Sequence, residues 1–279
     1  MSAVVAPAAI EFKPARVAAR RAFGGLLLRD LHVLRINVVQ FAIRTIMQPL
    51  LLVFVFTYVF PKIGQGVGGS EQAEAAFSTL LMAGVMATSL VFQGVQAVAL
   101  PLVQEFGYTR EIEDRVMAPL PVWMVAIEKI VSGGVQGLLA ALVVFPLAAV
   151  IPLTPVHLTI RWGYLITIGP LAAWVGASLG LVMGTRVAPY QVPLLFSIVV
   201  IPITFLGAIY YPWAHLSSIP WLQVLVLINP LVYMSEGLRM ALTSGVPHMS
   251  PWVVYGALSF FAVLLTWLGL RGFERRVLS

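Results

Sequence analysis

The chain has 279 residues, of which 60% are hydrophobic and 10% charged, and its formal net charge is +6. Soluble domains carry roughly a quarter charged residues, so this composition excludes a soluble fold and indicates a protein whose solvent is lipid. The chain has no cysteine, which excludes disulfide frameworks, thiolate metal sites and cysteine nucleophiles.

The first part of the chain is basic. No compact apolar region followed by a small-residue cleavage site occurs there, so we expect no cleaved signal peptide. Within residues 15–36, helical spacing places Phe23 and Leu27 on one face and Arg21 and Arg29 on the opposite face. This pattern predicts an amphipathic helix in the membrane interface, with its arginines toward anionic headgroups. The alternative is a basic tail that only sets the topology.

Six apolar segments have the length of membrane-spanning helices and lack the short alternating pattern of transmembrane strands. They are residues 38–60, 76–103, 122–151, 162–185, 190–208 and 252–270. The run 222–234 is shorter than the roughly 20 residues that a span needs, and Asn229-Pro230 interrupts it. We therefore expect an all-α integral membrane protein with six transmembrane helices. Residues 209–248 are expected to form an outer re-entrant helical hairpin between spans five and six.

The basic residues predict the orientation of the chain. With six spans, only Lys62, Arg161 and Arg239 of the 17 lysines and arginines fall on the outer side. A seventh span at 222–234 would move the arginines of 271–276 outside and break the positive-inside bias. We therefore expect both termini to be cytoplasmic.

The sequence carries few groups for chemistry of its own. It has no P-loop of the GxxxxGK[ST] form, and its four histidines are scattered without metal-ligand spacing. Ionisable residues within the apolar segments are confined to their ends, at Glu128-Lys129 and near Glu236 and Arg239. This distribution disfavours an ion-coupled carrier, which needs coupling sites near the midplane. We expect no catalytic residue, and an energy source outside this chain.

The charged stretch 104–121 (QEFGYTREIEDRVMAPLP) lies between the second and third spans and is too short to fold alone. Thr109 is a plausible N-cap and Pro119 a stop, so a short helix is expected between them. Ile112 and Val116 would form an apolar ridge on that helix, which suits insertion into a groove of a partner protein. The alternative is a solvated turn between two spans.

Two stretches carry a family resemblance. REIEDRVMAPLPVWMVAIEKI, residues 110–130, resembles the cytoplasmic coupling helix and following span of ABC-transporter permeases of the type-2 export class. TFLGAIYYPWAHLSSIPWLQVLVLINPLVYMSEGLRMAL, residues 204–242, resembles the outer re-entrant segment of that family. The likeness covers essentially the whole chain, so residues 1–279 are expected to form a single ABC type-2 transmembrane domain.

The resemblance implies partners and site residues. It implies a second permease copy, as a homodimer or possibly a heterodimer, and two separate ATP-binding subunits that bind ATP and Mg. No cofactor is expected in this chain, no nucleic acid is expected as a partner, and the location implied is the cytoplasmic membrane of a prokaryote. Coupling to the ATPase would involve Glu105, Tyr108, Arg110, Glu111, Ile112, Glu113, Asp114 and Arg115. Candidates for lining the translocation path are Thr45, Gln48, Phe56, Tyr58, Gln93, Gln96, Ser197 and Thr204. An outer gate would be formed by Tyr210, Tyr211, Pro212, Asn229, Pro230 and Tyr233.

The family exports amphiphilic drugs, lipids, glycolipids, lipid-linked polysaccharides and teichoic acids. The form of the coupling motif here looks more like the drug and lipo-oligosaccharide branch, so export of an amphiphilic drug, lipid or glycolipid is the expected function. Export of a lipid-linked polysaccharide or teichoic-acid-like polymer is the alternative. Two alternative functions from other classes of membrane protein stay open: an ion-coupled secondary transporter and a membrane scaffold subunit.

Overall fold

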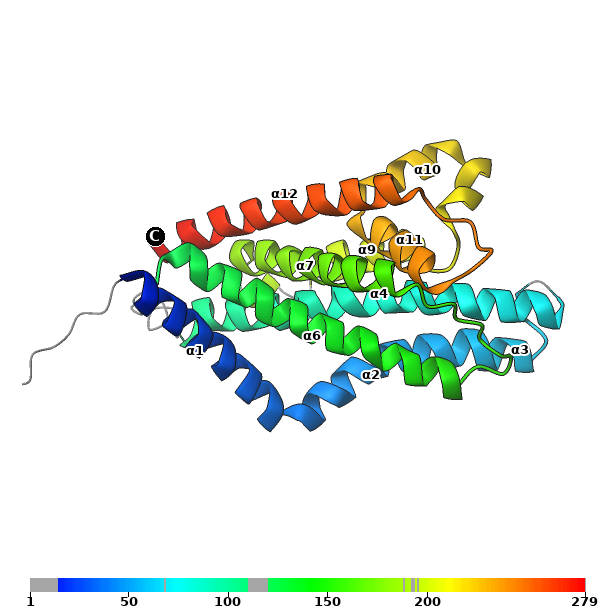
Figure 1. Ribbon diagram of the computed structural model, residues 1–279, viewed down its shortest axis with the longest axis horizontal. Helices are drawn as coiled ribbons and strands as arrows, with labels where there is room; N and C mark the ends of the chain where they lie inside the picture. The colour runs from blue at the N-terminus through cyan, green and yellow to red at the C-terminus, as the bar shows by residue number, and fades with distance from the viewer. Residues whose placement is uncertain are drawn as a thin grey trace, which may run out of the picture.

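The computed structural model describes residues 15–67, 69–109, 120–187, 189–191, 194 and 196–278. Within these residues the protein is helical and contains no β-strand. The long helices run side by side along one axis (Figure 1). The prediction of an all-helical protein is therefore confirmed for the part of the chain that the structure describes.

The described residues form a series of helical elements. In chain order they are α1 (Ala15–Ile36), α2 (Val38–Phe54), η1 (Val55–Val59), α3 (Phe60–Lys62), α4 (Glu71–Gln104), η2 (Glu105–Thr109), α6 (Val122–Val150), α7 (Trp162–Arg186), η3 (Pro189–Gln191), η4 (Phe196–Val200), α9 (Ile201–Phe205), η5 (Trp213–Ser218), α10 (Pro220–Leu225), η6 (Val226–Ile228), α11 (Pro230–Leu242) and α12 (Pro251–Leu278). Two π-helical turns, η1 and η2, continue the long helices α2 and α4.

Five helical segments in the described residues are long and apolar enough to cross a membrane. They are Val38–Lys62, Glu71–Gly107, Val122–Val150, Trp162–Arg186 and Pro251–Val277. These match five of the six predicted spans, and the second and last extend beyond their predicted bounds. A sixth crossing would require the pair Pro220–Ile228 and Pro230–Leu242, bent by 97°, to act as one broken span.

The predicted span 190–208 is described only in part. Its described pieces are η3, the π-helical η4 and the five-residue α9, while residues 192, 193 and 195 lie outside the described residues. A continuous span at 190–208 therefore stays a prediction.

Helix α4 forms the centre of the bundle and packs against α6, α7 and α11. Close approach of α4 and α7 depends on glycines, as is common where helices meet in lipid. A Cβ atom on Gly94 would lie 2.8 Å from the Ala177 nitrogen, and one on Gly180 would lie 2.9 Å from the Gly94 oxygen. These two positions therefore require glycine for the observed distance between the helices.

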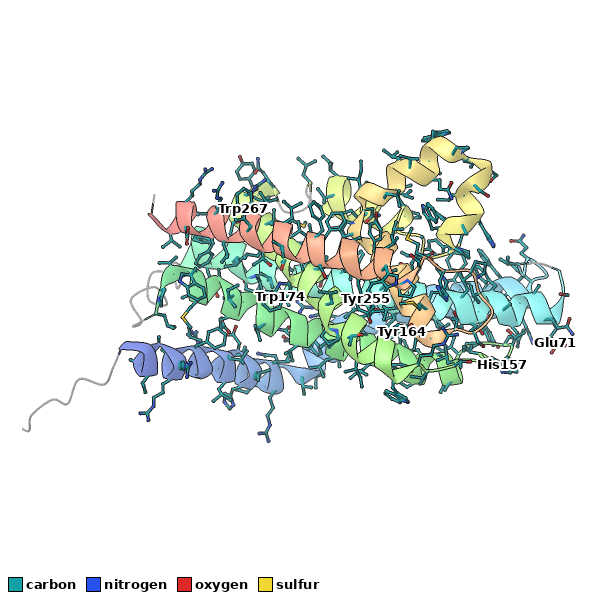
Figure 2. The ribbon with its side chains drawn as sticks, turned by 45° about the horizontal axis from the view of Figure 1, so that its top comes forward. Glu71, His157, Tyr164, Trp174, Tyr255 and Trp267 are labelled. Carbon is teal, nitrogen blue, oxygen red and sulfur yellow. The ribbon has the colours of Figure 1, made fainter. Side chains whose placement is uncertain are left out.

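Polar side chains also join α7 to α12. The Trp174 indole donates a hydrogen bond to the Thr266 hydroxyl at 2.9 Å, and Tyr255 and Thr167 are hydrogen-bonded through their hydroxyls. Trp174 and Tyr255 lie between the two helices in Figure 2. Since unpaired polar groups are costly in an apolar environment, these bonds stabilise the pairing of the two spans.

Helices α1 and α2 meet at Asn37 and form an open angle beside the bundle (Figure 1). The Asn37 amide donates to the Val33 carbonyl at 3.0 Å and so caps the end of α1. Helix α1 packs against α6, whereas α2 is largely exposed and contacts α4 and α6. The angle between α1 and α2 therefore leaves one side of α4 and α6 uncovered.

One end of the bundle gathers several chain segments. The C-terminal end of α12, the start of α1, the end of α4 and the start of α6 all lie at this end, opposite α3 and α10 (Figure 1). Residues 110–119, the central part of the predicted coupling stretch, lie outside the described residues.

Candidate functional site

A cavity of about 700 Å³ lies in the angle between α1 and α2, against α4 and α6. We call it the polar groove, because amide and charged side chains form much of its wall. These are Arg29, Asp30, Asn37, Gln40, Arg44, Gln96, Gln104, Glu105, Lys129 and Gln136. Apolar side chains such as Val33, Phe41 and Leu100 complete the wall. A groove of this composition offers polar partners for a headgroup beside apolar surface for a chain.

Behind the polar groove, a row of hydrogen-bonded polar side chains connects α2, α4 and α6. The Thr45 hydroxyl of α2 donates to the Gln93 side-chain oxygen of α4 at 3.3 Å. The Gln93 amide in turn donates to the Gln136 oxygen of α6 at 3.5 Å. Gln93 is only 4% exposed, so these bonds satisfy an amide that burial would otherwise penalise.

Sequence reasoning singled out two of these residues and missed the third. Thr45 and Gln93 were expected near a translocation path, and the structure brings them together behind the groove wall. Gln96 lines the groove itself. Gln136 was not predicted, although it is an amide in the middle of an otherwise apolar segment, which could have marked it.

An ion cluster closes the groove at the end where α4 stops. The Lys129 ammonium lies 2.8 Å from the Glu105 carboxylate and 3.7 Å from the Asp30 carboxylate. Lys129 and Glu105 are both buried. The cluster joins α1, α6 and the first residue of η2, from which the chain continues into residues 110–119.

The predicted coupling residues are described only at their N-terminal edge. Glu105 is the member with a described side chain, and it belongs to the ion cluster. Tyr108 lies in η2, where its backbone alone is described. The remaining predicted residues, Arg110, Glu111, Ile112, Glu113, Asp114 and Arg115, lie outside the described residues, and their role stays a prediction.

The other candidates for the translocation path are spread over the protein. Gln48 is half-buried on α2, and Tyr58 is exposed with its ring stacked on Phe54 at 5.4 Å. Ser197 is exposed on η4, while the buried Thr204 hydroxyl donates to the Val200 carbonyl at 2.7 Å. None of these four lines the polar groove formed by the described residues.

At the opposite end of the bundle, a buried ion pair organises the segment around α11. The Arg239 guanidinium pairs with the Glu236 carboxylate and donates to the Ala208 carbonyl at 2.8 Å. Glu236 accepts two backbone N–H groups, from Trp213 and from Met249, each at 2.8 Å. We call this set the outer clamp. It connects the segment before α10, the helix α11 and the segment before α12.

Ala208 supports the outer clamp with an uncommon backbone conformation. Its φ of 52° lies in the left-handed region, which few residues other than glycine adopt. In this conformation its carbonyl accepts the Arg239 hydrogen bond. Sequence reasoning placed Glu236 and Arg239 at the end of the outer hairpin and missed both the pairing and the burial.

The predicted gate residues gather around the outer clamp. The Asn229 side chain donates to the Ile203 carbonyl at 2.7 Å and accepts from the Leu231 nitrogen at 2.9 Å, so it caps α11. Pro230 occupies the first position of α11, where its missing N–H costs nothing. The Tyr233 hydroxyl donates to the Leu227 carbonyl at 3.0 Å across the 97° bend.

An aromatic pair at the other side of the outer clamp links the segment after α9 to η1. The rings of Tyr210 and Phe56 have centroids 5.1 Å apart. Tyr211 contributes its carbonyl, which lies 3.5 Å from Arg239, and Pro212 is buried directly after it. Burial raises the pKa of the Tyr210 and Tyr211 hydroxyls above the ordinary value for tyrosine.

Comparison with known proteins identifies a matching family model and similar proteins that share one name. The family model described as "ABC-2 type transporter" matches residues 21–243. The Escherichia coli K12 protein named "Inner membrane transport permease YadH" is 24% identical over 232 residues, which cover 81% of this chain and 86% of the relative. The protein of the same name from Shigella flexneri matches with the same identity and coverage.

Proposed function

The chain belongs to the ABC-2 type transporter family, and from this we propose that it is the permease subunit of an ATP-driven exporter. It moves an amphiphilic drug, lipid or glycolipid outward across the cytoplasmic membrane. Its relatives are named inner membrane transport permeases, and its long apolar helices suit a multi-pass protein of that membrane. The family association implies an ABC ATP-binding subunit as a partner.

The polar groove is the observation that carries this proposal. It is about 700 Å³ in volume and adjoins the helices Val38–Lys62, Glu71–Gly107 and Val122–Val150, each able to cross a membrane. An amphiphile fits such a groove because its head can bond to the amides while its chain stays against apolar side chains. In this proposal, Gln96 contacts the head, and Thr45 and Gln93 hold the wall behind it.

Energy reaches the spans through residues 104–121. This stretch docks into a cleft of the ATP-binding subunit, with Arg110, Glu111, Ile112, Glu113, Asp114 and Arg115 at the contact. The ion cluster of Asp30, Glu105 and Lys129 supports this route, since it joins α1 and α6 to the chain that enters the stretch. Two permease copies and two ATP-binding subunits form the transporter, and ATP and Mg bind to the latter.

The topology that goes with this function has six spans and both termini in the cytoplasm. Residues 15–36 lie in the membrane interface, and residues 209–248 form the re-entrant segment on the outer face. The bend of 97° between Pro220–Ile228 and Pro230–Leu242 supports a re-entrant shape. The gate residues Tyr210, Tyr211, Pro212, Asn229, Pro230 and Tyr233 move with that segment when the transporter opens outward.

Two experiments test the proposal. Co-purification in mild detergent should recover a P-loop ATPase with the permease, and Glu113→Arg should weaken that complex. Proteoliposomes that contain both subunits should export an amphiphilic drug or a lipid-linked sugar only when ATP is present. The proposal is wrong if no ATPase associates, or if an imposed proton gradient drives transport without ATP. Preference for a long lipid-linked polymer over both probes would favour the alternative substrate class.

A further inference from the structure

A second cavity, of about 620 Å³, lies between the last turns of α7 and α12 and is separate from the polar groove. Four arginines line it, namely Arg186, Arg271, Arg275 and Arg276. No acidic residue lines it among the residues that the structure describes. We call it the arginine cavity. It sits at the end of the bundle that holds the C-terminal part of α12 (Figure 1).

One of the four arginines, Arg276, stabilises the fold. The Arg276 guanidinium donates to the Val187 carbonyl at 2.9 Å and to the Thr185 carbonyl at 3.3 Å. These carbonyls belong to the end of α7, whose last groups have no partner within the helix. Arg276 therefore joins α12 to the end of α7 and closes one side of the cavity.

The other three arginines have their hydrogen-bonding groups available. Arg186, Arg271 and Arg275 form no hydrogen bond or ion pair with the described part of the chain. Helix C-termini favour cations, and cytoplasmic loops are rich in them, which accounts for arginines near this end. Neither effect accounts for three of them around one cavity, where their combined positive charge attracts an anion.

The remaining lining residues indicate what kind of anion fits. The Arg271 guanidinium carbon lies 3.9 Å from the centroid of the Trp267 ring, and Leu268 continues the apolar side of the cavity. Trp267 lies on α12 near the end that carries the C-terminus (Figure 2). The apolar part of α12 before Arg271 has the length that crosses roughly 30 Å of hydrocarbon. The arginines therefore lie at headgroup depth, with Trp267 and Leu268 just inside the apolar layer.

We propose that the arginine cavity binds the phosphate headgroup of an anionic phospholipid. Arg186, Arg271 and Arg275 pair with its phosphate oxygens, and Trp267 and Leu268 contact the first part of its acyl chains. Arginine suits this task because its planar fork binds phosphate through two parallel bonds. A soluble phosphate or a partner protein fits less well, since neither uses apolar surface at the depth of Trp267. Basic pockets between spans on the cytoplasmic side commonly take such headgroups.

Lipid titration of the full-length chain tests this site. The chain is purified in neutral detergent, and binding of dioleoylphosphatidylglycerol and dioleoylphosphatidylcholine is followed by native mass spectrometry. Phosphatidylglycerol should bind at least about tenfold more tightly, because only its headgroup carries a net negative charge. The variant Arg271→Gln/Arg275→Gln should lose at least about tenfold in phosphatidylglycerol affinity. The lipid titration itself needs no ATP-binding subunit, so failure of the proposed function would not change its result.

The control variant Lys62→Gln/Arg161→Gln removes the same charge from exposed positions at the end of α3 and just before α7, outside the cavity. It should change the affinity less than about twofold, because it leaves all three cavity arginines in place. If the first double variant does not fold, Arg186→Gln at the exposed end of α7 replaces it and should also weaken binding.

Four results would overturn the proposal. The first is equal binding of the two lipids, and the second is an equal loss of phosphatidylglycerol affinity in the control variant. The third is displacement of the lipid by millimolar inorganic phosphate. The fourth is loss of ATPase co-purification in Arg271→Gln/Arg275→Gln with lipid binding intact. The third would identify a site for soluble anions. The fourth would identify a docking surface for the ATP-binding subunit.

Discussion

Glu236 and Arg239 lie one helical turn apart on α11 and form an ion pair that is inaccessible to solvent, with exposures of 1% and 0%. The pair is also bonded to backbone groups on both sides of α11, at Ala208, Trp213 and Met249. Such a pair is costly to desolvate. Both Glu236 oxygens and the two terminal Arg239 nitrogens have partners, whereas the buried Arg239 Nε has none among the described residues. The pair therefore holds in one arrangement three segments that are far apart in sequence.

The first prediction concerns this pair. Arg239→Met should destabilise the protein by about 3–5 kcal/mol, because it leaves the Glu236 carboxylate buried without its cation. Unfolding in mixed micelles with increasing SDS measures the change. Arg161→Met, an exposed position beside the end of α11, serves as the control and should cost under about 1 kcal/mol. A loss below about 1 kcal/mol in Arg239→Met would show that water reaches the outer clamp.

The helices themselves follow from the sequence to a large extent. Apolar length alone located five of the crossing helices, since a span of about 20 residues is set by the thickness of the hydrocarbon layer. The bend at Asn229-Pro230 was also visible, because proline removes a donor and asparagine caps the next helix.

The side-chain contacts could be predicted from the sequence much less well than the helices. Lys129 and Asp30 are distant in sequence, and nothing in either segment indicates that α1 would lie against α6. The sequence placed Glu236 and Arg239 in the outer hairpin, and nothing in that segment indicates that the two side chains pair or are buried. Their burial depends on which segments cover α11, and tertiary packing alone decides that.

The second prediction ranks two changes in the ion cluster. Lys129→Met should destabilise the protein more than Glu105→Gln, because it leaves two carboxylates close together at a buried position. Glu105→Gln keeps an oxygen that accepts from Lys129 and keeps the contact between Lys129 and Asp30. SDS unfolding measures both variants, and Lys62→Met, an exposed lysine at the other end of the bundle, is the control. The reverse ranking would mean that Lys129 is solvated.

The third prediction concerns the crossing of α4 and α7. Gly94→Ala should destabilise the protein by about 1–3 kcal/mol, since the new methyl group would overlap the backbone of Ala177. Gly256→Ala is the matched control, because no heavy atom outside its own turn of α12 lies within 4 Å of the added carbon. That control should be neutral or stabilising by up to about 1 kcal/mol through helix propensity. Equal effects of the two substitutions would contradict the close approach of α4 and α7.

The fourth prediction tests the polar groove in transport. Gln96→Leu removes an amide that lines the groove without disturbing the bonds of Thr45, Gln93 and Gln136. If the amide contacts the substrate head, losing a neutral hydrogen bond of about 0.5–1.5 kcal/mol should lower transport at limiting substrate roughly two- to tenfold. ATP-driven efflux from proteoliposomes measures this, and SDS unfolding should show unchanged stability. Gln72→Leu, an exposed glutamine at the start of the same helix, should leave transport unchanged. Equal transport by Gln96→Leu and the wild-type protein would place the substrate path elsewhere, and the next surface to test would be that of Ser197 and Tyr58.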